Sequence, residues 1–146
     1  MKIHKLISHR GNISGPDIKN ENEPSYILNS IGLGFDCEID VWYIDNVLLL
    51  GHDKPQHKIS LDFLLEHKEF FWIHCKNFEA LNYLNSKNEM NYFWHEEDRF
   101  TITSKGFIWT YPENIVGKNS VIVDNRSQTS EYNCYGICSD YVELYK

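Results

Sequence analysis

Apolar and polar positions follow two kinds of pattern along the first half of the chain. Short apolar or alternating runs predict strands at residues 5–8, 35–43 and 70–75. From Pro24 onward the apolar positions instead recur on one face, as they do in an amphipathic helix. The residues of that face are Ile27, Leu28 and Ile31. Proline suits the first turn of a helix, so we expect a helix to begin at Pro24.

Two further helices are predicted by their capping residues. Ser60 and Asn77 are each followed by apolar residues at helical spacing, and both residue types commonly cap helices. Strand-like runs continue beyond residue 90, at residues 92–94, 107–111, 121–123 and 136–137. The segments between these later runs are too short or too polar for full helices.

The alternation of strands and helices is typical of an α/β protein with a parallel sheet. A complete TIM barrel takes ~250 residues, whereas this chain has 146. We therefore expect a single domain over residues 1–146, built as a reduced or irregular TIM-type (βα) barrel that lacks helices in its second half. A partner chain could complete such a thin wall, so a homodimer stays open.

Composition excludes several classes of function. The net charge of -7 argues against broad nucleic-acid binding, which needs a basic surface. No run approaches the ~20 apolar residues of a membrane span, and the first residues lack the apolar stretch of a signal peptide. The four cysteines show no Cys-x-x-Cys spacing that would indicate a zinc module. We therefore expect a cytoplasmic protein.

Two carboxylates on one predicted strand are the first candidate for chemistry. In a strand, Glu38 and Asp40 point to the same face, about 7 Å apart along the backbone, while Ile39 points the other way. Paired carboxylates suit a hard divalent cation that prefers oxygen ligands. The alternative is an acidic strand edge that faces solvent, which is the usual place for carboxylates.

A predicted hairpin adds a histidine to this pair. Asp45-Asn46 is typical of a two-residue hairpin turn. If Ile44 pairs with Val47, the returning strand brings His52 to the level of the two carboxylates. A histidine in that place is a candidate general acid or base.

The tripeptide His9-Arg10-Gly11 follows the first predicted strand. Arginine binds phosphate oxygens with a planar fork of donors. In βα barrels the carboxyl ends of the strands carry the chemistry, so this position favours a functional role over a surface pair.

Taken together, the motifs resemble those of the glycerophosphodiester phosphodiesterases, which belong to the phospholipase-C-like phosphodiesterase superfamily. The match is dense from about residue 6 to residue 53. It consists of His9-Arg10-Gly11, then Glu21-Asn22-x-Pro24-Ser25-Tyr26-Ile27, then Gly34-x-Asp36-x-Glu38-x-Asp40-Val41, and then His52-Asp53.

The resemblance implies roles for individual residues. His9 and His52 would be the acid/base pair, and Arg10 would contact the phosphate. Glu38 and Asp40 would be metal ligands. The resemblance also implies that Glu21 lines the site.

The rest of the chain matches the family more thinly. Residues 71–76 look like the family's third strand, in which Lys76 would contact the substrate phosphate and His74 stands where a third carboxylate ligand is expected. Imidazole still binds divalent ions but shifts preference toward softer metals, so Mg²⁺, Ca²⁺ and Mn²⁺ all stay open. Trp109, Tyr111 and Asp140 also fall in segments similar to the family, for which we predict packing roles. His95 begins an acidic segment that we interpret as a solvated loop, with a place in the pocket as the alternative.

The sequence therefore predicts a metal-assisted phosphodiesterase that hydrolyses a glycerophosphodiester or a related small phosphodiester by His/His acid–base catalysis. One alternative is a degraded barrel that binds a phosphate or polyol without turnover. Another is a metal-independent, cyclising activity similar to that of some phospholipases. No organic cofactor is indicated.

Overall fold

The computed structural model describes residues 2–87 and 89–146. Within them lie three short α-helices, a final 3₁₀ helix and ten strands. The helices are α1 (Pro24–Gly32), α2 (Leu61–Glu66), α3 (Phe78–Lys87) and η1 (Val142–Tyr145). The strands are β1 (Lys5–His9), β2 (Asp36–Ile44), β3 (Val47–Leu50), β4 (His57–Ile59), β5 (Phe71–Cys75), β6 (Tyr92–Trp94), β7 (Phe100–Ile102), β8 (Ile108–Thr110), β9 (Ser120–Val123) and β10 (Gly136–Ser139). No helix in these ranges is long and apolar enough to cross a membrane.

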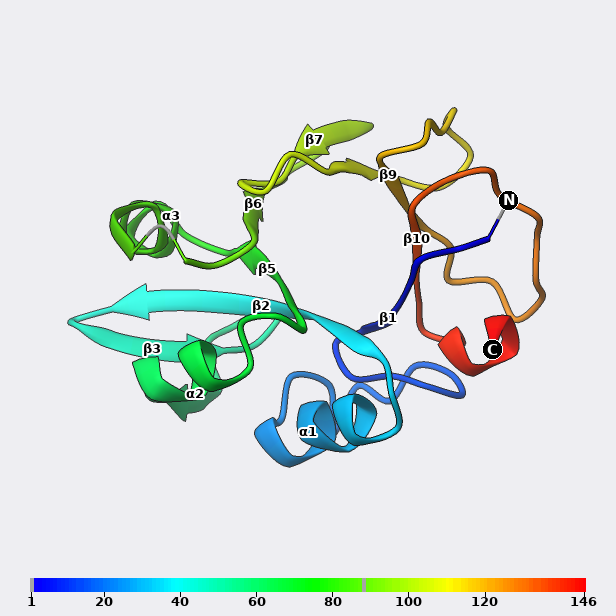
Figure 1. Ribbon diagram of the computed structural model, residues 1–146. Coiled ribbons are helices and arrows are strands. Elements are labelled where there is room, and N and C mark those ends of the chain that lie inside the picture. The colour runs from blue at the N-terminus through cyan, green and yellow to red at the C-terminus, as the bar shows by residue number, and fades with distance from the viewer. Residues whose placement is uncertain (1, 88) are drawn as a thin grey trace.

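All ten strands belong to one curled, mixed sheet (Figure 1). Parallel pairings link β6, β5, β2, β1, β10, β9 and β8 in that order. The β2–β3–β4 meander and the β7–β8 hairpin add antiparallel pairs. The two ends of the sheet, β6 and β7, approach each other, and the backbone N–H of Ser104 donates to the carbonyl of Tyr92 at 2.8 Å.

The expected TIM-type (βα) barrel is wrong. In such a barrel every parallel strand is followed by a helix that covers the outside of the sheet. Here the three α-helices lie along the part of the sheet that holds β1, β2 and β5, whereas the described residues from β6 to the C-terminus form loops and the single 3₁₀ turn η1 between and after the strands (Figure 1). The segment after β8 is interrupted by Pro112 and Gly117, and the segment after β9 is polar and contains residues of low helix propensity such as Asn125 and Ser127. The fold is therefore a mostly β, curled half-barrel.

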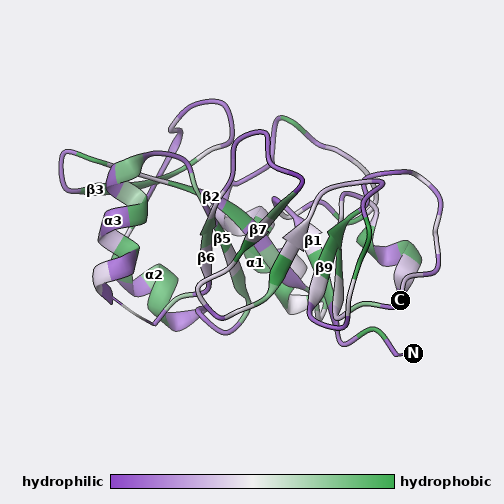
Figure 2. Cartoon of the chain, turned by 90° about the horizontal axis from the view of Figure 1, so that it is seen from above, coloured by the Kyte–Doolittle hydropathy of each residue, from purple (hydrophilic) through white to green (hydrophobic). Residues whose placement is uncertain are grey.

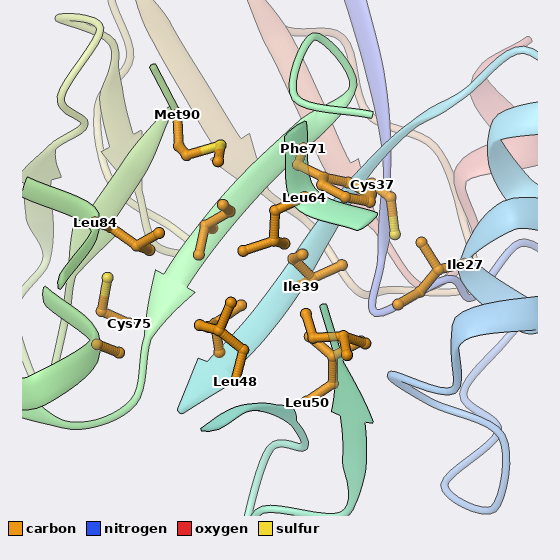
Figure 3. Close-up of a cluster of buried hydrophobic side chains, with 14 residues drawn as sticks. Ile27, Cys37, Ile39, Leu48, Leu50, Leu64, Phe71, Cys75, Leu84 and Met90 are labelled. Carbon is orange, nitrogen blue, oxygen red and sulfur yellow. The ribbon is translucent and has the colours of Figure 1, made fainter. Parts of the chain in front are cut away.

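Alternation along the strands sorts side chains between two faces. On β2, Cys37, Ile39 and Val41 point outward and pack beneath the helices with Ile27 and Leu64 (Figure 3). The inward face of the sheet carries a second apolar cluster, made of Ile7, Trp72, Phe93, Trp109, Val121, Val123 and Cys138. Apolar colour follows the strands and polar colour the surrounding loops, as Figure 2 shows. The inward cluster fills the curl below the carboxyl ends of the strands.

The hairpin predicted at residues 45–46 forms with the expected register. Ile44 pairs with Val47 and Val41 with Leu50, and both turn residues have positive φ. The strand then ends at Gly51, whose amide donates to the carbonyl of Asp40 at 3.1 Å. A Cβ on Gly51 would overlap the backbone carbonyl oxygen of Lys54, so only glycine fits here.

Replacing Gly51 tests this close approach. Gly51→Ala should lower the free energy of unfolding by about 1–3 kcal/mol, because the Lys54 carbonyl and the loop that carries His52 must move. Urea denaturation measures the change. Gly32→Ala is the matched control, since nothing lies near its Cβ position, and it should be neutral or slightly stabilising. Equal stability of the two variants would contradict the predicted clash.

A buried carboxylate holds the C-terminal segment against the sheet. Asp124 is 2% exposed and accepts hydrogen bonds from Arg126, from Tyr132 at 2.6 Å and from Tyr145 at 3.0 Å. Arg126 donates through two nitrogens, at 2.8 and 2.7 Å. The Arg126 hydrogen bonds, together with those of the two tyrosines, hold the pKa of Asp124 well below its usual range.

This lowered pKa predicts a pH-dependent stability. A carboxyl with a lower pKa in the folded state stabilises the fold above its unfolded pKa of about 3.9, and the contribution is lost as the pH falls below that value. Asp124→Asn should therefore cost about 1.5–3 kcal/mol at pH 7, with a smaller difference from wild type below about pH 4. Thermal unfolding across this pH range measures both effects. Glu131→Gln, an exposed change in the same loop, should leave the profile unchanged.

Candidate active site

Polar side chains gather where the parallel strands end, on the inward face of the sheet. On strand after strand, an apolar residue of this face is followed two positions later by a polar one. These pairs are Ile7 and His9, Trp72 and His74, Phe93 and His95, Trp109 and Tyr111, and Cys138 and Asp140. The aromatic cluster thus forms a floor, and the polar residues stand above it.

The strand ends enclose a cavity of about 310 Å³. Six residues singled out by the sequence line it, namely His9, Arg10, Glu38, His52, His74 and Lys76. Asp40 lies beside the cavity, completely buried, in contact with Arg10 and His74. The structure thus brings six of the seven residues to one cavity and places Asp40 directly behind it, while their catalytic and metal-binding roles stay predictions.

The two carboxylates of β2 are buried side by side. Glu38 is 2% exposed and Asp40 is fully buried, so the alternative of a solvent-facing acidic edge is wrong. Burial, reinforced by the neighbouring charge of Asp40, raises the pKa of Glu38 well above its ordinary value. Burial also acts to raise the pKa of Asp40, but contact with His74 and the charge of Arg10 outweigh it, and that pKa falls below its usual range.

Asp40 is held by groups on three sides. Asn22 donates its side-chain amide to Oδ2 at 2.8 Å and accepts from the Asp40 backbone N–H at 2.9 Å. Arg10 Nε lies 3.4 Å from Oδ2, and His74 Nδ1 lies 3.2 Å from Oδ1. The position of the Asp40 carboxylate is therefore fixed by the fold.

The contacts of the His74 ring suit a cation at this point. Its Nε2 lies 3.2 Å from the backbone carbonyl of His95, which can only accept, so Nε2 carries a hydrogen. In a neutral ring the lone pair of Nδ1 would then face a carboxylate oxygen of Asp40. This contact is favourable only when a positive charge, either a second proton or a metal ion, accompanies it.

The donor set fits a divalent metal ion. One ligand atom from each of Glu38, Asp40 and His74 can be chosen so that all lie within 4.8 Å of one another. Among the residues that the structure describes, no hydrogen-bond partner is found for the buried atoms Glu38 Oε2 and Asp40 Oδ1, which is costly unless a cation satisfies them. Two carboxylates and an imidazole are ordinary ligands of such ions.

His9 is oriented by a carboxylate from the other end of the chain. Its Nδ1 lies 2.8 Å from Oδ1 of Asp140, which follows β10. The hydrogen bond to His9 outweighs the effect of burial and lowers the pKa of Asp140, so this carboxylate is ionised and accepts from Nδ1–H. In the neutral ring Nε2 is therefore free to accept a proton, and it points toward Glu38 at 3.6 Å.

Arg10 adopts a left-handed backbone conformation, with φ of 58°, that turns its side chain over the carboxylates. Arg10 contacts Glu21 through Nη1 at 3.2 Å. Arg10 lines the cavity, whereas Glu21, which was expected to line the site, lies behind Arg10 and contacts the cavity only through it. Burial acts to lower the pKa of Arg10, but the charges of Glu38, Asp40 and Glu21 outweigh it. The guanidinium therefore stays charged at the edge of the cavity.

His52 sits at a more open edge of the cavity. Its side chain is 36% exposed, and its Nδ1 contacts Asp53 at 2.7 Å. Burial is the main cause that lowers the pKa of His52. His52 lies on the opposite side of β1 from Asp140, because β2 and β3 adjoin one edge of β1 and β10 the other.

Some cavity residues differ from their predicted place. Trp109 and Tyr111, for which packing was predicted, also line the cavity, and His95 lies there rather than in a solvated loop. His95 stacks on Tyr111 at 3.6 Å between ring centroids, and burial lowers its pKa to about 4.

Sequence reasoning missed Asn12 and the roles of Asn22 and Asp140. Each follows a recognised motif, but its partners come from distant segments. Only Asp140, at the end of an inward strand face, offered a signal that could have been used.

Comparisons with known proteins add no assignment to this geometry. No protein-family model matches the chain, and no significant match is found among curated proteins or solved structures.

Divalent-ion titration tests the metal site. Mn²⁺ should raise the melting temperature at least as strongly as Mg²⁺, because His74 is a softer ligand than a carboxylate. The stabilisation should reach about 2.7 kcal/mol when the free ion is at 100 times its dissociation constant.

Glu38→Gln should remove this ion-dependent rise while making the ion-free protein more stable, because burial and the charge of Asp40 disfavour an ionised Glu38 and an amide carries no charge. Glu66→Gln, an exposed change on α2, should behave as wild type. A wild-type melting temperature that no divalent ion alters would argue against the site.

Proposed function

We propose that the chain is a metal-assisted phosphodiesterase acting on a glycerophosphodiester or a similar small phosphodiester. The observation that carries the proposal is the convergence of two imidazoles, two cationic side chains and a buried carboxylate pair on one cavity. The proposal is also supported by the resemblance of residues 6–53 to the glycerophosphodiester phosphodiesterases. The residues that carry this resemblance are the ones that lie at the cavity.

The cavity supplies what a phosphodiester requires. Arg10 and Lys76 stand at its wall as the cations for the phosphoryl oxygens. Its volume of about 310 Å³ is at the lower end for ligand pockets, which favours a small head group. The aromatic floor keeps water away from below and strengthens the electrostatic interactions above it.

The two histidines divide the proton transfers. His9 is the better placed base, because Asp140 fixes its ring and leaves Nε2 free to accept a proton from the attacking hydroxyl or water. His52, held through Nδ1 by Asp53, would act as the acid in its doubly protonated form: it would give its Nε2 proton to the leaving alkoxide and take a proton back from water before the next turnover. If the attacking group is a hydroxyl next to the phosphate, the first product is a cyclic phosphate, and product analysis separates this course from direct hydrolysis.

Glu38, Asp40 and His74 would hold the divalent ion, which would supply Lewis-acid stabilisation of charge on the phosphoryl group. Arg10 also contacts Asp40, so the phosphate-binding arginine and this carboxylate are oriented together. Asn22 keeps the carboxylate in place when no ligand is present.

A specific observation favours a second candidate, a binding module without turnover. Asp40 already has Arg10 and His74 within 3.4 Å, so a doubly protonated His74 could neutralise it without a metal ion. The site would then bind a phosphate or polyol but lack the Lewis acid. Turnover of a generic phosphodiester, with and without chelator, distinguishes the two candidates.

Replacing either histidine tests the catalytic proposal. His9→Ala and His52→Ala should each lower kcat by ~10²–10⁴-fold, which is the usual contribution of a positioned acid or base. The double variant should lose scarcely more than the worse single variant if both act on one proton-transfer path.

His57→Ala is the control, because His57 lies in β4 and does not line the cavity, and it should keep wild-type turnover. Wild-type protein that cleaves no phosphodiester, with several metals and head groups tried, would favour the binding module.

A further inference from the structure

The loop after β1 contains an asparagine with a completely buried side chain, Asn12. Its amide nitrogen donates to Glu21 Oε1 at 3.0 Å and to Asp140 Oδ1 at 2.9 Å. Its amide oxygen accepts from the Tyr26 hydroxyl at 2.9 Å and from the Asp17 backbone N–H at 3.2 Å. Both donors and both acceptor positions of the side chain are therefore used.

The neighbours of Asn12 determine which way its amide points. The nitrogen faces two carboxylates, which can only accept when they are ionised, and the oxygen faces two donors. A flipped amide would place its oxygen against both carboxylates and its nitrogen against a backbone N–H. Only one orientation satisfies the network, so the amide is a directional link.

The two carboxylates that Asn12 joins serve different parts of the cavity. Asp140 orients His9 through Nδ1, at 2.8 Å. Glu21 binds the guanidinium of Arg10, at 3.2 Å. The amide of Asn12 thus binds both Asp140, which orients the candidate base His9, and Glu21, which binds the candidate phosphate-binding residue Arg10.

We propose that Asn12 is a positioning residue that ties His9 and Arg10 into one geometry through Asp140 and Glu21. This inference rests on the proposed function for its kinetic consequence, but the positioning itself is independent of turnover. The chemical reason is that proton removal and phosphate binding must be aligned on the same substrate, since small misplacements cost much of the rate.

A purely structural role is the competing explanation, because a buried asparagine also fills space and satisfies the Tyr26 hydroxyl. Asn12→Asp separates the two. The aspartate keeps the size of the side chain and an oxygen for Tyr26 and Asp17, but it replaces the donating amide with an oxygen beside Glu21 and Asp140. The aspartate also brings a third carboxyl group to Glu21 and Asp140, so a loss is assigned to the missing link only when the uncharged Asn12→Ala variant shows it as well.

The experiment compares Asn12→Asp and Asn12→Ala with the control Asn20→Ala. Asn20 lies in the same loop, is exposed, and makes one side-chain hydrogen bond to Asp17. Three quantities are measured on folded protein: the NMR signal of the His9 Hδ1 proton, the affinity for inorganic phosphate, and kcat and KM for a phosphodiester.

In both Asn12 variants we expect the His9 signal to shift or broaden, phosphate affinity to fall, and kcat/KM to fall about 10–100-fold, as is typical when an orienting partner is lost. The control should match wild type in all three. Variants that fold and keep the wild-type His9 signal and phosphate affinity would overturn the inference.

Failure of the proposed function gives a different result. A wild-type protein without turnover removes the kinetic readout, and the His9 signal and phosphate affinity then decide whether Asn12 positions the two residues. If phosphate does not bind either, an unchanged His9 signal overturns the inference and a shifted one supports it. If Asn12→Ala fails to fold, Asn12→Leu, which is uncharged and close to asparagine in size, carries the test in its place.

Discussion

The structure depends on the burial of two like-charged groups next to each other on β2. Glu38 and Asp40 occupy consecutive inward positions and lose almost all contact with water. An isolated carboxylate in this place would be very unfavourable, so the fold must surround the pair with positive charge and hydrogen-bond donors. Asp40 is touched by Arg10 and Asn22, which lie in the loop between β1 and α1, and by His74 of β5. The need to satisfy this pair therefore determines how the first loop and β5 are arranged around β2.

The same strand also shows how the core and the site are separated. Residues that alternate with the carboxylates pack under the helices, so a single strand carries the main hydrophobic cluster on one face and the charged cluster on the other. The charged face does not extend down the curl, because Trp72, Phe93 and Trp109 fill it below. Dispersion and stacking among these rings hold the strands at a fixed separation. The cavity keeps its shape for this reason, although few helices support the sheet from outside.

Local signals in the sequence were read correctly, and those that depend on distant contacts were not. The caps at Ser60 and Asn77, the helix at Pro24 and the hairpin register around Ile44 and Val47 follow from neighbouring residues, and all are present. Strand alternation likewise predicted that Glu38 and Asp40 point to the same face of the sheet. The barrel was inferred by extending the βα pattern of the first half into segments that form no helix. Strands β4 and β7 were missed because β4 has a single apolar residue and β7 lies within the mostly polar stretch 95–105. Asn12 could not be found, since its partners Glu21 and Asp140 are brought to it by tertiary structure.

The position of β1 in the sheet has a consequence for how the protein folds. β1 lies between β2 and β10, and His9 meets a carboxylate 131 positions further along the chain. Bringing two strands this far apart in the sequence together lowers the conformational entropy of the chain before their contacts can stabilise the fold. Sheets that depend on such long-range pairings therefore fold slowly. Until β10 arrives, one edge of β1 has unpaired amides and carbonyls next to Ile7 and Leu6, which invites association with other chains. A folding intermediate with the helical half formed and β10 still detached would therefore be the species most prone to aggregate.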